Sequence, residues 1–298
     1  MEKFRNVSLL VLTLLPLLSC VTGCEKERAG YNGVENGSLH CTINGEQFWF
    51  WAEKPEMIKL FLFPTSGVEL KNDEIRIEGG TVYNIPDNRY DMIALTGNLK
   101  NTNYRGMGNY HTAEIYLPEK IDKDGNSVIG QPEIVYADRG SVHISPERTT
   151  EKELQPVSLV KCLAFRIKSV GIAPIEKYSC CLTGVATAIR LHNAEPVNCR
   201  SSVIFEPEKV ITDYFSRVLV FGFSTAKDRI TLLNIDCFLS NGSKKSVTLD
   251  LTRYIDLFNS DSASCTIEID FEHLDVALNP SVTITDWQTG TNGYIELN

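Results

Sequence analysis

Four oxygen-bearing side chains in the middle of the chain have nearly the spacing of a cation-binding loop. Asp122, Asp124 and Asn126 occupy alternate positions, and Glu133 stands at the twelfth place counted from Asp122. Side-chain oxygens at such positions bind Ca²⁺ in helix–loop–helix sites, where glycine fills the sixth place. Here Ser127 fills that place, and no helical pattern flanks the loop. We therefore favour a solvated turn without a metal ion, and a calcium site is the weaker alternative.

Residue patterns typical of catalysis are absent from the sequence. The chain has no HExxH pattern, no G-x-S-x-G turn, no phosphate-binding glycine loop and no dinucleotide-binding glycine pattern. The carboxylates are scattered, so no pair of them stands out for acid–base chemistry. The sequence thus predicts a protein that is not an enzyme and that needs no cofactor.

Cysteine supplies the other reactive groups. Seven of the nine cysteines lie beyond the N-terminal region, and an odd number cannot all pair within one chain. Their spacing matches no zinc site, because no CxxC occurs and two of them are adjacent. Several stand in apolar runs, where a free cysteine behaves as a small hydrophobic residue. We expect mostly buried free thiols at the following positions: Cys41, Cys162, Cys180, Cys181, Cys199, Cys237 and Cys265.

The N-terminus has the pattern of an export signal. Lys3 and Arg5 precede an almost wholly apolar run over residues 7–18. A membrane-spanning helix needs about 20 apolar residues, so this shorter run after a basic start is typical of a signal peptide. We place the signal at residues 1–23. No second apolar stretch approaches the length of a membrane span.

A thiol follows the signal at the position where bacterial lipoproteins carry lipid. Such signals end in an aliphatic residue, two small residues and a cysteine, and Val21-Thr22-Gly23-Cys24 follows that order. Cys20 is the alternative, although Leu18 is large where a small residue is usual. An ordinary secretory signal with two incidental cysteines is the other interpretation. Acylation of Cys24 would anchor the chain, because two or more acyl chains hold a protein stably on a membrane.

Residues 24–37 have the composition of a flexible tether. They are rich in glycine, asparagine and charge, and they lack the apolar surface that folding requires. The acidic residues directly after Cys24 resemble the surface-export signal of Bacteroidetes lipoproteins. The net charge of the chain is −9, and removal of residues 1–23, which carry +1, leaves −10. An acidic chain of this kind has no electrostatic footprint for nucleic acid.

The rest of the chain reads as mostly β. Apolar and polar residues alternate in many short runs that are separated by turn residues such as Asn241-Gly242. Only residues 175–181 and 252–257 have patterns that favour short helices. The clearest expected strands are 57–64, 81–86, 90–96, 159–170, 182–191, 217–223, 230–239, 245–251 and 266–271. Many short strands with frequent turns favour β-sandwiches.

A polar, charged stretch over residues 146–153 interrupts the β pattern. We place a domain boundary there, because linkers between domains have such composition. The expected domains are an N-terminal β-sandwich at 38–150 and a C-terminal β-sandwich at 151–298.

Several of these runs, taken in order, resemble the fimbrillin-associated anchor proteins of Bacteroidales and related Bacteroides lipoproteins. The resemblance is carried by residues 57–67, 79–86, 90–98, 165–170, 182–186 and 282–287. It implies an all-β chain of two tandem transthyretin-like β-sandwiches, held by lipid at the outer membrane and exposed on the cell surface. It also implies an anchor or accessory role in a fimbria, with partner subunits that add a strand to an exposed sheet position.

A surface protein that binds glycans or host proteins is the competing interpretation. Exposed aromatic residues would favour it, and the sequence offers Trp49, Trp51, Trp287, Tyr104 and Tyr110. The tryptophans also fit a role in the hydrophobic core, which we consider the better interpretation. A hydrolase has no constellation of residues to support it.

Overall fold

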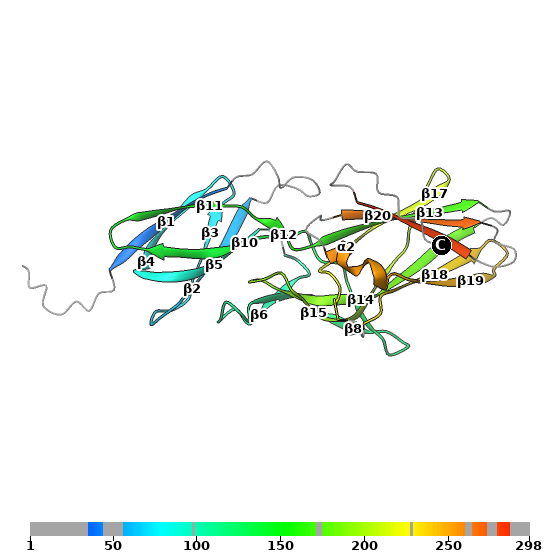
Figure 1. Cartoon of the computed structure of the whole chain (residues 1–298), viewed down its shortest axis with the longest axis horizontal. Helices are drawn as coiled ribbons and strands as arrows, with labels where there is room; N and C mark the ends of the chain where they lie inside the picture. Colours follow the sequence, from blue (N-terminus) through cyan, green and yellow to red (C-terminus); the bar gives the residue numbers. More distant parts are fainter. Residues whose placement is uncertain are drawn as a thin grey trace, which may run out of the picture. The chain divides into compact units, whose positions relative to one another are not determined.

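The protein is built almost entirely from β-strands (Figure 1). The computed structural model describes residues 35–43, 56–96, 99–170, 175–226, 229–259, 264–272 and 279–286. The described residues from Asn36 onward belong to one compact unit. In the described residues, no helix is long and apolar enough to span a membrane.

Two sheets form the first sandwich. Sheet A consists of β11 (Thr149–Leu154), β1 (Asn36–Ile43) and β4 (Gly80–Pro86), in that order. Sheet B consists of β12 (Val157–Ser158), β10 (Tyr136–Ile144), β5 (Asn88–Thr96), β2 (Met57–Pro64) and β3 (Lys71–Arg76). Leu39 of β1 and Val82 of β4 pack against Ile58 and Leu60 of β2, so the core lies between the two sheets.

Two larger sheets form the second sandwich. Sheet C contains β19 (Lys244–Asp250), β18 (Leu232–Leu239), β14 (Ile175–Arg190), β15 (Pro196–Phe205), β9 (Ser127–Ile129) and β8 (Glu119–Ile121). It is extended by β7 (Glu114–Tyr116), which pairs with β14, and by β6 (Asn103–Arg105), which pairs with β7. Sheet D contains β16 (Glu208–Val210), β17 (Asp213–Val220), β13 (Lys161–Val170), β20 (Ser264–Glu272) and β21 (Asn279–Asp286).

Alternating apolar residues on facing strands fill the second core. Leu163 and Phe165 of β13 are buried against Tyr178 and Leu182 of β14. The 3-10 helix η1 (Thr252–Tyr254) and helix α2 (Ile255–Asn259) follow β19, and Phe258 of α2 adds to the same core.

Sheet B is apolar on both faces. Leu60 and Met92 point into the first sandwich, whereas Phe63, Ile93 and Leu95 belong to the hydrophobic cluster of the second. The segment 99–129 lies between β5 and β10 in the sequence, yet its strands β7 and β9 pair with β14 and β15 of sheet C. Because this segment is held to sheet C, its apolar residues Ile115 and Leu117 can pack in one cluster with Ile93 and Leu95 on the outer face of sheet B.

The all-β expectation is confirmed, with differences in detail. The segment 175–181, expected as a helix, is instead the first part of β14, because its alternate residues pack into the core while its backbone pairs with β18. The helical expectation for 252–257 is confirmed by η1 and α2. The strand β3 was not expected from the sequence.

Strands on the two sides of the boundary expected at residue 150 pair with each other. The polar segment proposed as a linker contains all of β11 except Leu154, and β11 pairs in parallel with β1. The ranges 38–150 and 151–298 as separately folding domains stay a prediction.

Candidate binding site

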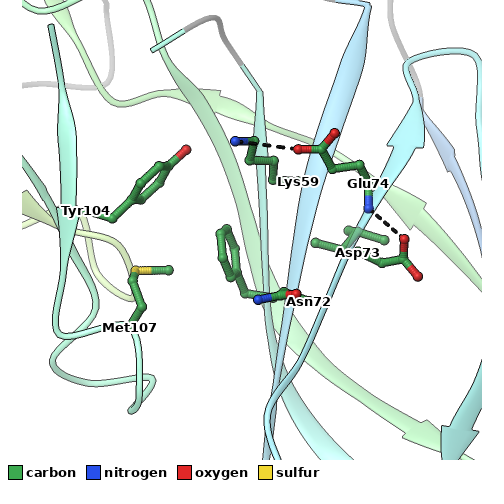
Figure 2. A pocket seen from close by; sticks show the side chains of 8 residues that line it. Lys59, Asn72, Asp73, Glu74, Tyr104 and Met107 are labelled. Carbon is green, nitrogen blue, oxygen red and sulfur yellow. Dashed lines mark hydrogen bonds and ion pairs between the residues drawn. The ribbon is translucent and has the colours of Figure 1, made fainter. Parts of the chain in front are cut away.

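A pocket of about 340 Å³ opens on the outer face of sheet B (Figure 2). One wall is formed by two adjacent cross-strand pairs, Lys59 with Glu74 and Phe61 with Asn72. Residues that face each other across a strand pair project from the same side of a sheet, so these four side chains share one surface. The opposite wall comes from β6 and the loop after it. The complete lining is Lys59, Leu60, Phe61, Asn72, Asp73, Glu74, Tyr104 and Met107.

An aromatic ring and charged groups meet in this pocket. The ring of Tyr104 lies 6.1 Å from that of Phe61, between centroids, and Lys59 Nζ is 5.7 Å from the Tyr104 centroid. Lys59 Nζ also lies 3.5 Å from Glu74 Oε1. Burial, with a smaller effect of the Glu74 carboxylate, raises the pKa of Tyr104 to about 12. The phenol is therefore neutral and can both donate and accept a hydrogen bond.

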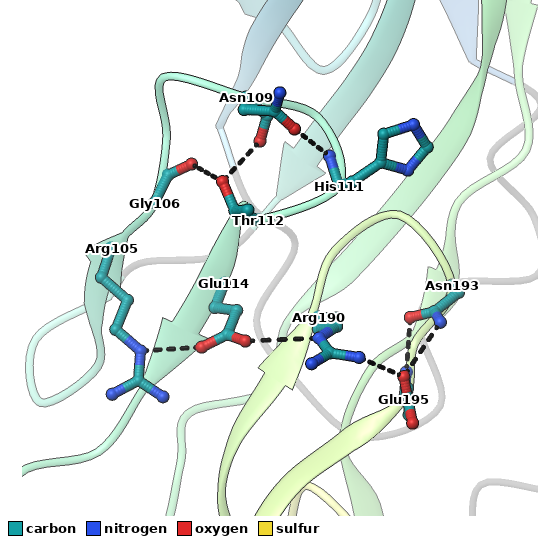
Figure 3. Close-up of polar contacts among 9 residues, drawn as sticks. All are labelled: Arg105, Gly106, Asn109, His111, Thr112, Glu114, Arg190, Asn193 and Glu195. Atoms are coloured by element: carbon teal, nitrogen blue, oxygen red, sulfur yellow. Dashed lines mark hydrogen bonds and ion pairs between the residues drawn. The ribbon is translucent and has the colours of Figure 1, made fainter.

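A chain of ion pairs connects β6, the strand that carries Tyr104, to β7 and β14 (Figure 3). Arg105 Nε of β6 is 2.7 Å from Glu114 Oε2 of β7, and Glu114 Oε1 is 3.5 Å from Arg190 Nε of β14. Arg190 Nη1 in turn lies 2.6 Å from Glu195 Oε2 in the turn before β15. Glu114 is the most enclosed member, since its side chain is 12% exposed. Backbone pairing and these charges together hold β6 to sheet C.

The loop between β6 and β7 is a tight turn organised by Asn109. Asn109 Oδ1 accepts a hydrogen bond of 2.8 Å from the backbone N–H of His111, and Thr112 Oγ1 donates to the Gly106 carbonyl at 2.9 Å (Figure 3). An asparagine that bonds to its own backbone two residues later is a common turn former. Gly106 has a φ of 66°, and a Cβ there would overlap the Thr112 carbonyl. The turn places Met107 at the pocket.

The residues of the calcium-like pattern serve other purposes. Asp122 Oδ1 accepts hydrogen bonds from the backbone N–H groups of Asp124 and Asn126, at 2.9 and 2.8 Å. These bonds lower the pKa of Asp122. Glu133 instead bonds the backbone of Lys100 and Asn101 and the Thr102 hydroxyl. Within the described part of the chain, no group of three His, Cys, Asp or Glu side chains could hold a metal ion.

The predicted aromatic residues divide into three sets. Tyr104 lines the pocket. Tyr110 lies farther along the same loop, with its ring centroid 5.8 Å from that of Phe63. The three tryptophans (Trp49, Trp51 and Trp287) and the lipidation candidates (Cys24 and Cys20) lie outside the described residues.

Sequence reasoning missed most of the pocket. The run over residues 57–64 is apolar on both alternating faces apart from Lys59, which indicates a strand covered on both sides. That signal could have placed Phe61 at a contact surface. Nothing local indicates that Tyr104 would meet it, because the two residues are far apart in sequence and are brought together by the pairing of β6 with sheet C.

Free thiols are found where they were expected. Five cysteines are buried and Cys181 is partly exposed, and none of these six forms a disulfide. The five buried ones are Cys41, Cys162, Cys180, Cys199 and Cys237. Burial raises the pKa of Cys180 to about 12. The side chain of Cys265 lies outside the described residues.

A family sequence profile matches residues 48–206, and its description is "Domain of unknown function (DUF5119)". No curated protein sequence matches the chain significantly.

Solved structures share the fold at low sequence identity. A protein of Bacteroides thetaiotaomicron, described as a candidate adhesin, is 11% identical to this chain with a TM-score of 0.61. The match covers 90% of this chain and 100% of that protein. The fimbrial anchor protein Mfa2 of Porphyromonas gingivalis is 11% identical with a TM-score of 0.60, covering 88% of this chain and 100% of its own. A candidate adhesin of Bacteroides ovatus is 14% identical with a TM-score of 0.60, covering 81% and 94%. The expected resemblance to Bacteroidales fimbrial proteins is thereby confirmed at the level of the fold.

Proposed function

Because the chain belongs to the DUF5119 family and shares its fold with a fimbrial anchor protein, we propose that it is a non-catalytic adhesion protein of the cell surface. In this proposal, lipid on Cys24 holds it to the outer membrane, and it serves as an anchor or accessory subunit of a fimbria. The observation that carries the proposal is the match to Mfa2, which extends over the full length of that protein at a TM-score of 0.60.

The sheet edges suggest how a fimbrial subunit could bind. Among the residues that the structure describes, β3 pairs only with β2 in sheet B, and β4 ends sheet A in the same way. An edge strand presents unpaired backbone groups that an extended segment of another subunit can pair with. Such strand addition would require little change in the sandwich itself.

The test is to recover the chain with the fimbriae that its own cells make. Wild-type cells should retain the chain in the outer membrane. After mild shearing and gentle solubilisation, a fimbrial subunit should co-purify with the chain. In Cys24→Ala cells, the chain should leave the membrane with the shed fimbriae. Cys20→Ala is the matched control and should behave as wild type. Recovery of the chain without any fimbrial subunit, under conditions that preserve other anchor complexes, would contradict the anchor proposal.

A second candidate function is supported by the pocket. A partly buried tyrosine ring beside amide and carboxylate side chains can contact the apolar face of a sugar and bond its hydroxyl groups. A surface protein that binds a glycan, or a side chain of a host protein, would therefore place its ligand between Tyr104 and Asn72. A solved structure with the same fold, from Bacteroides thetaiotaomicron, is described as a candidate polysaccharide-binding protein.

Glycan-array binding distinguishes the two candidates. Tyr104→Ala should weaken binding if the pocket takes a sugar. Tyr83→Ala is the matched control, because Tyr83 is 65% exposed on β4 and does not line the pocket. Equal glycan binding by the Tyr104→Ala and Tyr83→Ala variants would show that the pocket does not bind the glycan.

A further inference from the structure

Four rings from three separate parts of the chain form one contact. We call Phe63, Tyr110, His111 and His192 the aromatic cluster. Phe63 lies at the end of β2, Tyr110 and His111 lie in the loop between β6 and β7, and His192 lies in the turn between β14 and β15. The cluster therefore joins the outer face of sheet B to the second sandwich.

The two histidine rings are at the centre of the cluster. Their centroids lie 5.1 Å apart at an interplanar angle of 81°, an edge-to-face contact. The Tyr110 ring lies 5.3 Å from that of His111 and 5.8 Å from that of His192. Nδ1 of His192 is buried and has no hydrogen-bond partner among the described residues. The contact thus suits uncharged rings, because a protonated imidazole needs partners for both of its N–H groups.

We propose that the contact between His111 and His192 is proton-sensitive, and that acidification releases the loop between β6 and β7 from the second sandwich. A proton on His192 would place its charge against the His111 ring, 5.1 Å away between centroids, and would leave the buried Nδ1–H without a hydrogen-bond partner among the described residues. The titratable and charged groups around His192 are His111, Arg190, Glu195 and, from β10, Arg139. Those around Tyr110 are Asp91 from β5 together with Asp138 and Arg139.

Two of the nearby carboxylates, Glu195 and Asp138, already accept hydrogen bonds from other groups. Glu195 Oε2 accepts hydrogen bonds from Arg190 at 2.6 Å and from Asn193 at 3.2 Å. Asp138 accepts from the backbone N–H groups of Arg139 and Gln155, at 2.7 and 3.1 Å. These bonds would have to be broken or shared before either carboxylate could stabilise a new imidazolium.

The direction of the pH effect follows from burial. Burial lowers the pKa of His192, and the neighbouring His111 and Arg190 lower it further. The closed loop therefore binds fewer protons than the released loop, in which His192 regains its ordinary pKa of about 6.5. The closed state is fully favoured above that pH, and it loses stability as the pH falls below it.

The pocket is affected because the same segment forms its wall. Tyr104 and Met107 precede the aromatic cluster on β6 and its loop. Release of the loop would move Met107, which lies in it, away from the pocket, while Tyr104 stays on β6. A ligand in this pocket would then be held near neutral pH and released in acid, whatever its identity.

Hydrogen exchange of the full chain in detergent tests the inference without a ligand. Rates for residues 104–113 are compared at pH 7.5 and 5.0, after correction for the intrinsic pH dependence of exchange. We expect these amides to exchange faster at pH 5.0, by up to about thirtyfold, which is the most that titration of one histidine with an ordinary pKa of about 6.5 allows. Amides in β13 should change little.

Matched variants decide between this contact and a general effect of acid. His192→Gln keeps a polar side chain that cannot titrate, so the extra exchange at pH 5.0 should disappear in it. His143→Gln is the control, because His143 is exposed on β10, outside the cluster, and should leave the effect intact. Equal pH dependence in wild type and His192→Gln would overturn the inference, as would protection of residues 104–113 that does not change with pH.

Discussion

Gly106 is the residue on which the turn before the aromatic cluster depends. Its φ of 66° is costly for any residue with a Cβ, and the Thr112 carbonyl occupies the space that the Cβ would need. We predict that Gly106→Ala lowers the free energy of unfolding by about 1–3 kcal/mol. Gly108→Ala is the control, since no atom lies within 4 Å of a Cβ there. Denaturant titration measures both, and equal stability of the two variants would contradict the role of Gly106.

Cysteine reactivity gives a second prediction for single residues. Cys181 is the one partly exposed thiol among the six that the structure describes as free. Burial raises the pKa of Cys180, next to it, to about 12, so that thiol is both enclosed and protonated. Iodoacetamide under native conditions should therefore modify Cys181 well before the five buried thiols, as peptide mass spectrometry would detect. Modification of Cys180 at the same rate as Cys181 would show that β14 opens readily.

Single residues were predictable from the sequence only where their role is local. The Asp122 turn follows from neighbouring residues, and the structure has that turn. Glu133 was paired with it by spacing, but Glu133 bonds residues 100–102, which lie about thirty positions earlier. Tyr104 was recognised as an aromatic candidate, whereas its pocket depends on a contact with β2 that no local pattern contains.

Sheet B is the element that most differs from a simple sandwich sheet. Its inner residue Leu60 and its outer residue Ile93 are both 0% exposed. We predict that Leu60→Ala and Ile93→Ala each reduce stability by about 2–5 kcal/mol. If the outer face were solvated, Ile93→Ala would have little effect. Asp73→Ala, on the charged edge strand β3, serves as the control and should change stability by less than about 0.5 kcal/mol. Guanidinium unfolding curves provide the measurement.

Strand type was predictable, but strand partners were not. Alternation of apolar and polar residues identified β13 and β18, and the turn at Asn241-Gly242 identified the β18–β19 hairpin. The first part of β14 was wrongly expected to be a helix, since Glu176 and Lys177 interrupt its alternation. Pairing with β18 makes it a strand, and tertiary contacts of this kind commonly outweigh local preference.

At the scale of the whole molecule, the two sandwiches share chain segments. β7 and β9 come from the first half of the sequence and pair in sheet C of the second. We predict that a fragment of residues 36–160 leaves these strands and the outer face of sheet B uncovered, so that it binds the dye ANS strongly and lacks sharp thermal unfolding. A fragment that unfolds cooperatively and binds no dye would support independent domains with a boundary near residue 150.

The architecture at this scale was predictable from a resemblance, and its connections were not. The resemblance to the Bacteroidales anchor proteins implied two β-sandwiches, and the sheets of this chain form two. The exchange of segments between them depends on pairings such as Ala188 with Tyr116, which are far apart in sequence. No periodicity within a single run encodes such a partner.

The position of β1 has a mechanical consequence. β1 begins at Asn36, directly after the segment that would tether the chain to a membrane, and it lies between β4 and β11 in sheet A. Tension that enters at Asn36 along the strand would load the hydrogen bonds to both neighbours together, in shear, instead of opening them one at a time. Forced unfolding is governed by the rate of barrier crossing, and simultaneous rupture of two ladders makes that barrier high. In the tethered state that we propose, the strand nearest the attachment point would therefore be the one that resists drag on the chain best.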